Sequence, residues 1–198
     1  MSREQLGEAS KIEVRTTADG SPTLYVPALD EHYHSRHGAA QESRHVFIEA
    51  GLRPLLAAGY HPAGSPLRIL EVGLGTGLNA LLTLESTVQS GAAIAYDGYE
   101  TVPLPPALVA ALAPQWAAEP VLSQAFSQLH AAPWGAPVML AAGLVLTKMR
   151  AEVQAAALPA GYYNLIYFDA FAPKSSPSCG EKKYSEKYMF RLRPARCW

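Results

Sequence analysis

The stretch LRILEVGLGTGLN, residues 67–79, decides the fold of this chain. It begins with a short apolar run, residues 67–72, and continues with glycines at positions 73, 75 and 77. The residues from Asn79 to Leu84 then readily form a helix. An apolar run, a glycine cluster and a helix-forming segment in this order predict a strand, a tight turn and a helix. Glycines at such a junction let the backbone approach a ligand at the carboxyl edge of a sheet.

The same alternation continues downstream. Apolar runs predict further strands at residues 92–100, 144–146 and 163–168. Helices are predicted at residues 106–113, where prolines stand near the first turn, and at residues 149–158. Strands that alternate with helices indicate parallel pairing, with helices on both faces of the sheet. The predicted fold class is therefore α/β, a Rossmann-like, doubly wound, mainly parallel sheet.

Two elements are predicted upstream of the glycine turn. Residues 43–58 carry apolar side chains at a rough helical period, which predicts a helix with Ser43 as its N-cap. Residues 24–30 predict a small strand that precedes the sheet. Pro27 favours an edge position for that strand, because proline lacks the N–H that a central strand uses.

Composition limits the classes of protein. The chain has 198 residues, 49% of them hydrophobic, which suits one globular domain. We expect a polar N-terminal segment at residues 1–22 and the domain at residues 23–198. The formal charge of −1 does not indicate a highly cationic nucleic-acid binder. Residues 1–20 contain no apolar signal region, and prolines and polar residues interrupt the uncharged stretch 120–147, so a cytoplasmic protein with no membrane span is expected.

The glycine turn is compatible with two classes of ligand. A dinucleotide fingerprint spaces its glycines as G-x-G-x-x-G, but Leu78 occupies the place of the third glycine here. Glu71 precedes the turn, where its charge would repel a pyrophosphate and suit the cationic methionine end of S-adenosylmethionine. The pattern favours the methyl donor, and an NAD(P)-dependent oxidoreductase remains the alternative.

Acidic residues follow three of the predicted strands. Glu100 is placed to accept hydrogen bonds from both hydroxyls of a ribose, and Glu152 to reach an adenine edge. Asp169 ends the last strand, where the transferred methyl group would lie. An alkyl amine is mostly protonated at neutral pH, so a carboxylate there can orient it or assist the loss of its proton. Phe171 could stack on a base or shield the reacting centre.

Two other kinds of site are disfavoured. Four histidines, at positions 32, 34, 37 and 45, lack the acidic companions and spacing of a known metal motif, so no metal is expected. Cys179 and Cys197 also lack the companions that a zinc site needs. The serines at 175 and 176 lack the G-x-S-x-G context of a hydrolase nucleophile.

Four segments carry a resemblance to a known family. They are LYV at 24–26 with HYHS at 32–35, ESRHVF at 42–47, EVGLGTGLN at 71–79 and YFDAFAP at 167–173. Together they resemble the tRNA 5-methylaminomethyl-2-thiouridine methyltransferases, which occur alone or as the methyltransferase half of the bifunctional MnmC enzyme. The third segment is general for class I methyltransferases, whereas the others are more particular to this family.

The resemblance implies methyl transfer from S-adenosylmethionine to the aminomethyl group of 5-aminomethyl-2-thiouridine at the wobble position of tRNA. Asp169 would face the amine, and Tyr33, His34 and Phe171 would contact the tRNA substrate. The residues implied for the methyl donor are Glu42, which would help close its pocket, Glu71, Gly73, Gly75, Thr76, Gly77, Asn79, Glu100 and Glu152. No fused flavin domain is expected in a chain of this length, so another enzyme would make the aminomethyl precursor.

The C-terminal residues depart from the family pattern. After Pro177 the family continues with a helix and two further strands, whereas this sequence ends at Trp198 with an unusual composition from Ser178 onward. We therefore expect a sheet that lacks its last strands. An inactive, truncated remnant is the further alternative for the function.

Overall fold

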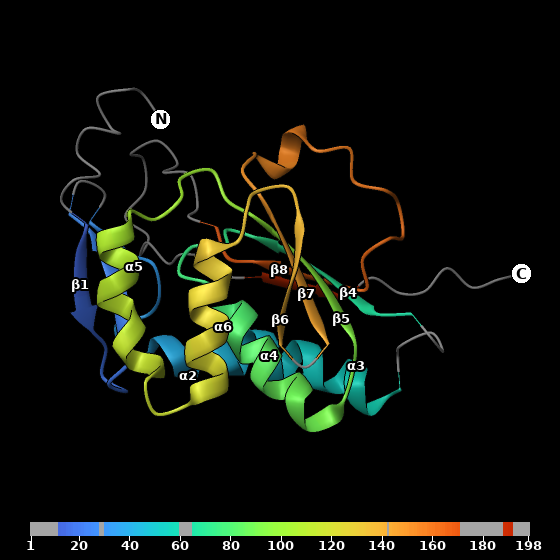
Figure 1. The fold of residues 1–198 in the computed structure, drawn as a ribbon, viewed down its shortest axis with the longest axis horizontal. Helices are drawn as coiled ribbons and strands as arrows, with labels where there is room; N and C mark the ends of the chain where they lie inside the picture. Colours follow the sequence, from blue (N-terminus) through green and yellow to red (C-terminus); the bar gives the residue numbers. More distant parts are fainter. Residues whose placement is uncertain (1–11, 28–29, 60–64, 142, 171–187, 192–198) are drawn as a thin grey trace, which may run out of the picture.

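The computed structural model describes residues 12–27, 30–59, 65–141, 143–170 and 188–191. A six-stranded sheet with the order β6-β7-β5-β4-β8-β9 lies at its centre (Figure 1). Its strands are β4 (Leu67–Val72), β5 (Ile94–Tyr99), β6 (Pro137–Ala141), β7 (Leu144–Met149), β8 (Leu165–Phe168) and β9 (Tyr188–Arg191). The four central strands pair in parallel, and the outer strands β6 and β9 pair antiparallel to their neighbours. The expected Rossmann-like α/β fold with a mainly parallel sheet is confirmed.

The winding of the chain reverses at β4. From β4 the chain moves outward to β5 and then to the outer strand β6, comes back to β7 between them, and afterwards crosses to β8 on the other side of β4. Open α/β sheets bind ligands at the carboxyl ends of the strands where this reversal occurs. The glycine turn follows β4, so it lies at that point of the sheet.

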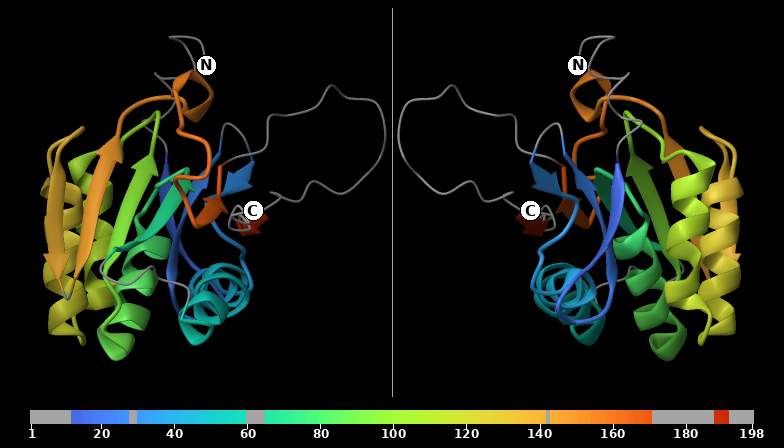
Figure 2. Two further views of the ribbon diagram at one scale, coloured as in Figure 1. Left: turned by 90° about the vertical axis from the view of Figure 1, so that its right-hand side faces the viewer. Right: turned by 90° about the vertical axis from the view of Figure 1, so that its left-hand side faces the viewer.

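The α-helices gather on one side of the sheet, as the two views of Figure 2 show. They are α4 (Leu78–Ser90), α5 (Pro106–Leu112), α6 (Pro120–Ala131) and a long helical segment made of α2 (Ala39–Ser43), the π-helix η2 (Arg44–Leu52) and α3 (Arg53–Ala57). A short 3-10 helix, η3 (Ala113–Trp116), follows α5. The main core lies between these helices and the sheet, where the rings of Phe47 and Tyr167 have centroids 5.0 Å apart.

In the part of the chain that the structure describes, the face of the main sheet opposite the α-helices is covered by a loop crossover and not by α-helices. A smaller apolar cluster of Leu70, Tyr99 and Tyr163 lies there, and Val153 and Ala156 pack against it. The crossover from β7 to β8 contains only the 3-10 helix η4 (Val153–Ala155), so the predicted helix at residues 149–158 is wrong. Within the described ranges no α-helix covers this face, so the prediction of helices on both faces of the sheet is wrong there as well. Most residues of this crossover are exposed, and alanine propensity alone does not sustain a short helix without an apolar face to bury.

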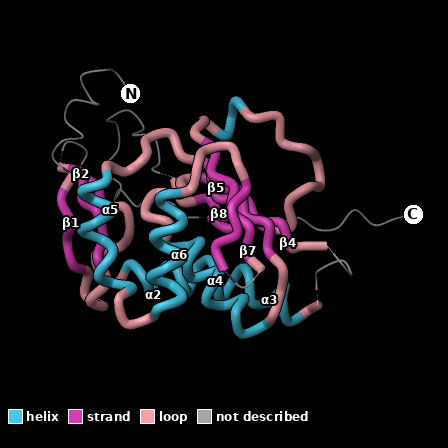
Figure 3. The backbone as a smooth tube through the Cα atoms, in the orientation of Figure 1, coloured by secondary structure: helices cyan, strands magenta, loops and turns pink. Residues whose placement is uncertain are grey.

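A small antiparallel sheet lies beside α5, apart from the main sheet (Figure 3). Its strands are β1 (Glu13–Thr16), β2 (Pro22–Val26) and β3 (Glu31–His32). The predicted edge position of residues 24–30 is wrong, because β2 is the central strand and Pro27 lies just beyond its end. Strand β1 belongs to the segment 1–22 and pairs with β2.

The long helical segment begins at Ala39, so Ser43 lies inside the helix and the prediction of Ser43 as its N-cap is wrong. The turn between β1 and β2 supplies the caps instead. The backbone N–H groups of Ala39, Ala40 and Gln41 donate to Thr17 Oγ1 at 3.3 Å, Ser21 Oγ at 3.1 Å and Asp19 Oδ2 at 3.0 Å. Side chains distant in sequence thus satisfy the unpaired donors of the first helical turn.

Among the described residues, no helix is long and apolar enough to cross a membrane.

Candidate functional site

The glycine turn has a backbone that only glycine adopts readily. Gly73, Gly75 and Gly77 have φ angles of 91°, 49° and 77°. The N–H of Gly77 donates to the Leu74 carbonyl at 2.8 Å and closes the turn, while the N–H of Gly73 donates to the Tyr99 carbonyl at 2.9 Å. A positive φ costs other residues about 1–2 kcal/mol each. The three glycines therefore keep the turn tight and attached to the end of β5.

The end of β8 lies directly against this turn. A Cβ atom at position 73 would stand only 2.6 Å from the carbonyl oxygen of Asp169. Glycine is therefore required at 73 for space as well as for its backbone angle. This close approach brings Asp169 to the start of the glycine turn.

Glu100 ties the end of β5 to the same turn. Its Oε2 accepts the N–H of Gly75 at 2.9 Å, and its Oε1 accepts the N–H groups of Thr101 and Val102 at 2.8 Å each. A carboxylate has about four acceptor positions, so these three bonds leave capacity for a ligand. The predicted contact of Glu100 with a ribose stays a prediction, and the structure adds a role for Glu100 in shaping the turn.

Glu71 is completely buried on the helical side of the sheet. Its Oε1 accepts a hydrogen bond from Asn79 Nδ2 and its Oε2 one from the Tyr96 hydroxyl, both at 2.8 Å. Burial, followed by the neighbouring charge of Asp169, raises the pKa of Glu71 to about 8. Glu71 has no exposed surface and holds Asn79, and its predicted contact with the methyl donor stays a prediction.

Asn79 joins two acidic side chains. Its Nδ2 donates to Glu71 Oε1 and also to Asp169 Oδ2, each at 2.8 Å. Its Oδ1 is buried and has no hydrogen-bond partner in the described part of the chain. An unsatisfied buried acceptor is costly, and such a group at a ligand site suits an N–H or O–H donor that arrives with the ligand. Asn79 therefore holds Asp169 in place and offers one acceptor of its own.

The raised pKa of Glu71 predicts a pH-dependent stability. The folded state favours protonated Glu71, so the unfolded state loses this proton first as the pH rises above 4.5, and the contribution of Glu71 to stability falls until about pH 8. Glu71→Gln keeps the shape without the charge. The free energy of unfolding of this variant, relative to the wild type, should increase between pH 5 and pH 8 in urea titrations. The exposed Glu119 provides the control Glu119→Gln, and equal pH profiles for both variants would contradict the prediction.

The segment after β3 brings one of its predicted residues to the turn. Tyr33 packs its ring against Gly75, with Cδ1 3.3 Å from the position of a Cβ there. Burial, followed by the charge of Glu100, raises the pKa of Tyr33 to about 12. His34 is buried, and its backbone N–H donates to Thr23 Oγ1 at 3.1 Å. This bond attaches the segment after β3 to β2. Glu42 accepts the N–H of Ser35 at 2.9 Å and anchors the same segment.

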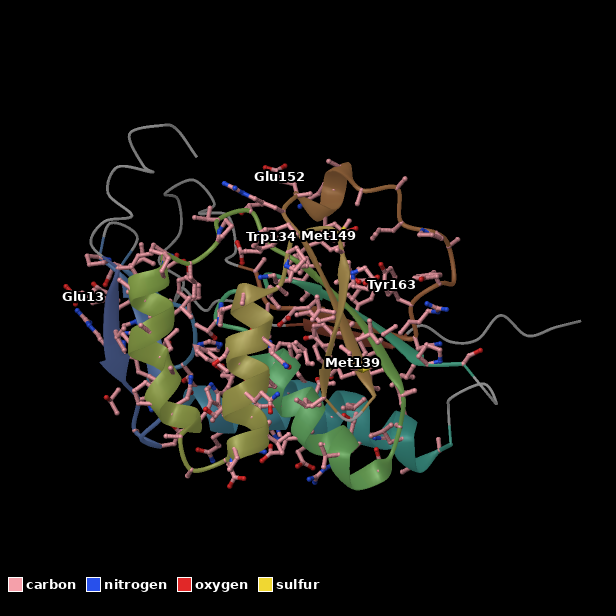
Figure 4. All side chains as sticks on the ribbon, viewed as in Figure 1. Glu13, Trp134, Met139, Met149, Glu152 and Tyr163 are labelled. Atoms are coloured by element: carbon pink, nitrogen blue, oxygen red, sulfur yellow. The ribbon has the colours of Figure 1, made fainter. Side chains whose placement is uncertain are left out.

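One predicted contact is not brought to this centre. Glu152 is exposed at the start of η4, and in Figure 4 it lies at the margin of the molecule beyond Met149. Its predicted contact with adenine stays untested. Phe171, Cys179 and Cys197 lie outside the described residues.

A pocket of about 510 Å³ opens from the glycine turn. It begins at Gly75 and Glu100 and continues between apolar side chains of α5 and α6, and its lining includes Trp134, His130 and Lys148. This volume is in the usual range for small-molecule sites. Sequence reasoning missed these last three residues, although a lysine at a buried position of the alternating strand β7 was a signal that could have been followed.

The buried Lys148 has a structural partner on α6. Its Nζ donates to the His130 carbonyl at 3.1 Å, in the last turn of the helix, and lies 4.7 Å from the centre of the Trp134 ring. Desolvation lowers the pKa of Lys148.

Among the described residues, no group of three or more histidine, cysteine or acidic side chains could hold a metal ion.

Comparison with solved structures shows a similar fold in a known protein. The fold is similar to the crystal structure of MnmC2 from Aquifex aeolicus, with a TM-score of 0.60 and 20% sequence identity. The match covers 87% of this chain and 58% of that chain, so this protein spans less than two thirds of its length. No protein-family model and no curated protein sequence matches the chain. At this identity the likeness establishes a shared fold.

Proposed function

We propose that this protein is an S-adenosylmethionine-dependent methyltransferase that methylates an amine on tRNA. The observation that carries the proposal is the joining of three groups at one point of the sheet. The glycine turn contacts Glu100 through the N–H of Gly75, and it contacts the end of β8 at Asp169. A donor site and an acidic group for the substrate are thereby adjacent.

The charges around the turn favour a cationic donor over a dinucleotide. Glu100 and Asp169 lie against the turn, and their charges both contribute to the raised pKa of the neighbouring Glu71. A pyrophosphate would add two negative charges to this environment and increase the repulsion. The positively charged sulfonium and α-ammonium groups of S-adenosylmethionine would instead be attracted to the carboxylates. S-adenosylmethionine is therefore the better fit.

The groups near Asp169 suit an amine as the methyl acceptor. Asp169 is a hydrogen-bond acceptor, which an amine or ammonium group needs, and Asn79 holds its carboxylate in place. Asp169 would orient the amine and assist the loss of its proton, so that the nitrogen lone pair can attack the methyl carbon. The sequence resemblance and the fold shared with MnmC2 support the aminomethyl group of 5-aminomethyl-2-thiouridine at the tRNA wobble position as this amine.

The direct test is methyl transfer from labelled S-adenosylmethionine to two tRNA pools, one carrying the aminomethyl nucleoside and one lacking it. Label should enter only the first pool. Calorimetric titration with S-adenosylhomocysteine and with NAD separates the donor classes, and binding of NAD alone would refute the proposal.

Glu100→Ala should weaken the binding of S-adenosylhomocysteine by roughly 1.5–3 kcal/mol, because charge-assisted bonds to the ribose are lost. The same change also releases the N–H of Gly75 from its acceptor. Calorimetry measures the affinity, with Glu119→Ala as the control at an exposed acid. Unchanged affinity of the Glu100 variant would mean that Glu100 neither contacts the ribose nor holds the turn in its ligand-binding form.

A further inference from the structure

The end of α6 makes a second set of contacts with the glycine turn. His130 Nε2 lies 3.2 Å from the carbonyl oxygen of Thr76. A carbonyl oxygen can only accept, so Nε2 must carry the proton and donate. Burial lowers the pKa of His130 to about 4, which keeps the ring neutral at physiological pH and leaves this tautomer in place.

The peptide unit between Thr76 and Gly77 is consequently held from several sides. His130 binds the carbonyl oxygen of this peptide unit, which belongs to Thr76. The N–H of the unit belongs to Gly77 and donates to the Leu74 carbonyl at 2.8 Å. A Cβ atom at position 77 would stand 2.9 Å from the side chain of Leu129, so the helix also packs directly against this glycine. The orientation of the peptide unit fixes the turn, because its C=O and N–H point in opposite directions from one rigid plane.

The end of α6 is itself secured to the sheet. Lys148 on β7 donates from Nζ to the His130 carbonyl, and the N–H of Gly135 donates to the Lys148 carbonyl at 2.7 Å. The aromatic rings of Phe126 and His130 are in contact, with centroids 4.5 Å apart. The backbone of His130 is therefore held in place, and its imidazole has little freedom to move away from the Thr76 carbonyl.

We infer that His130 is a positioning residue, which holds the Thr76 carbonyl and thereby keeps the glycine turn in its ligand-binding form. This inference rests on the proposed function for the identity of the ligand, an adenosyl methyl donor. His130 also lines the pocket that opens from the turn. A turn fixed before the ligand arrives binds more tightly, because less conformational freedom is lost on binding.

The test compares His130→Leu, which removes the donor, with His130→Gln, whose side-chain amide can still reach the Thr76 carbonyl. For the leucine variant, the Kd for S-adenosylhomocysteine and the KM for the methyl donor should rise about tenfold, the order expected from one lost hydrogen bond. The kcat at saturating donor should stay within about threefold, because the amine side of the site is not touched. Glutamine should restore most of the affinity, and the exposed His37 provides the control His37→Leu.

A second measurement needs no ligand. Hydrogen exchange at the amides of residues 73–78 should be faster in the free His130→Leu protein than in the wild type or the glutamine variant. If the wild type binds no S-adenosylhomocysteine, the proposed function fails and the exchange rates alone decide on His130. Unchanged exchange in the leucine variant, or equal loss of donor affinity in both variants, would overturn the inference.

Discussion

Asp169→Ala should slow methyl transfer to tRNA by roughly a hundredfold to ten-thousandfold, a much larger change than the one expected in donor affinity. This range is the one expected when a group that orients the substrate or accepts its proton is lost. Asp169 is held by Asn79 at 2.8 Å, on the β8 side of the glycine turn, whereas Glu100 contacts the turn from β5. Single-turnover transfer of a labelled methyl group measures the rate, and calorimetry with S-adenosylhomocysteine measures the affinity.

Asp169→Asn separates the two possible roles of the carboxylate. The amide keeps the shape and one acceptor oxygen, which can still receive the bond from Asn79, but it loses the charge. A rate near that of the wild type for asparagine, with a low rate for alanine, would assign Asp169 to orientation of the amine. Low rates for both would assign it to proton removal. If neither change slows transfer, the catalytic role of Asp169 is wrong.

Gly73→Ala should destabilise the fold by about 2–5 kcal/mol and abolish donor binding. The positive φ of 91° contributes about 1–2 kcal/mol of strain. The new Cβ would also stand 2.6 Å from the Asp169 carbonyl oxygen, and such overpacking costs about 1–3 kcal/mol or more when backbone must move. Urea unfolding measures the loss of stability, and calorimetry measures donor binding.

Gly91→Ala is the matched control for this variant. Gly91 has a similar φ of 68°, but no atom lies within 4 Å of a Cβ placed there. Its loss of stability should therefore contain the strain alone, about 1–2 kcal/mol. Equal losses at the two positions would show that β8 moves away from the turn without cost, and the close contact between them would then have no role in the site.

The main sheet was largely predictable from the sequence. The predicted strands at 92–100, 144–146 and 163–168 correspond to β5, β7 and β8, although β7 extends to Met149. Their apolar runs are local signals, and parallel pairing follows from alternation with helices. The outer strand β6 was not predicted, because its short run merged with the uncharged stretch around it. The predicted loss of the last strands concerns a region of which only β9 is described, and β9 extends the sheet beside β8.

Within the candidate site, the sequence placed Glu71, Glu100 and Asp169 at the ends of strands, since the carboxyl ends of parallel strands share one edge. It could not tell which of them is exposed. Glu71 is fully buried and bound to Asn79 and Tyr96, because its position in the pleat points it toward the helices. The alternation along the strand shows which side chains share a face with Glu71. It does not show which face of the sheet the helices cover.

The sequence by itself determined the strand, glycine turn and helix of residues 67–79, because backbone preference and apolar spacing act between near neighbours. The tertiary structure decided the contacts that shape the site. The bond from Asn79 to Asp169 joins residues 90 positions apart, and the bond from His130 to Thr76 joins residues 54 positions apart. Such contacts depend on how whole elements pack against one another, so no local pattern along the chain records them.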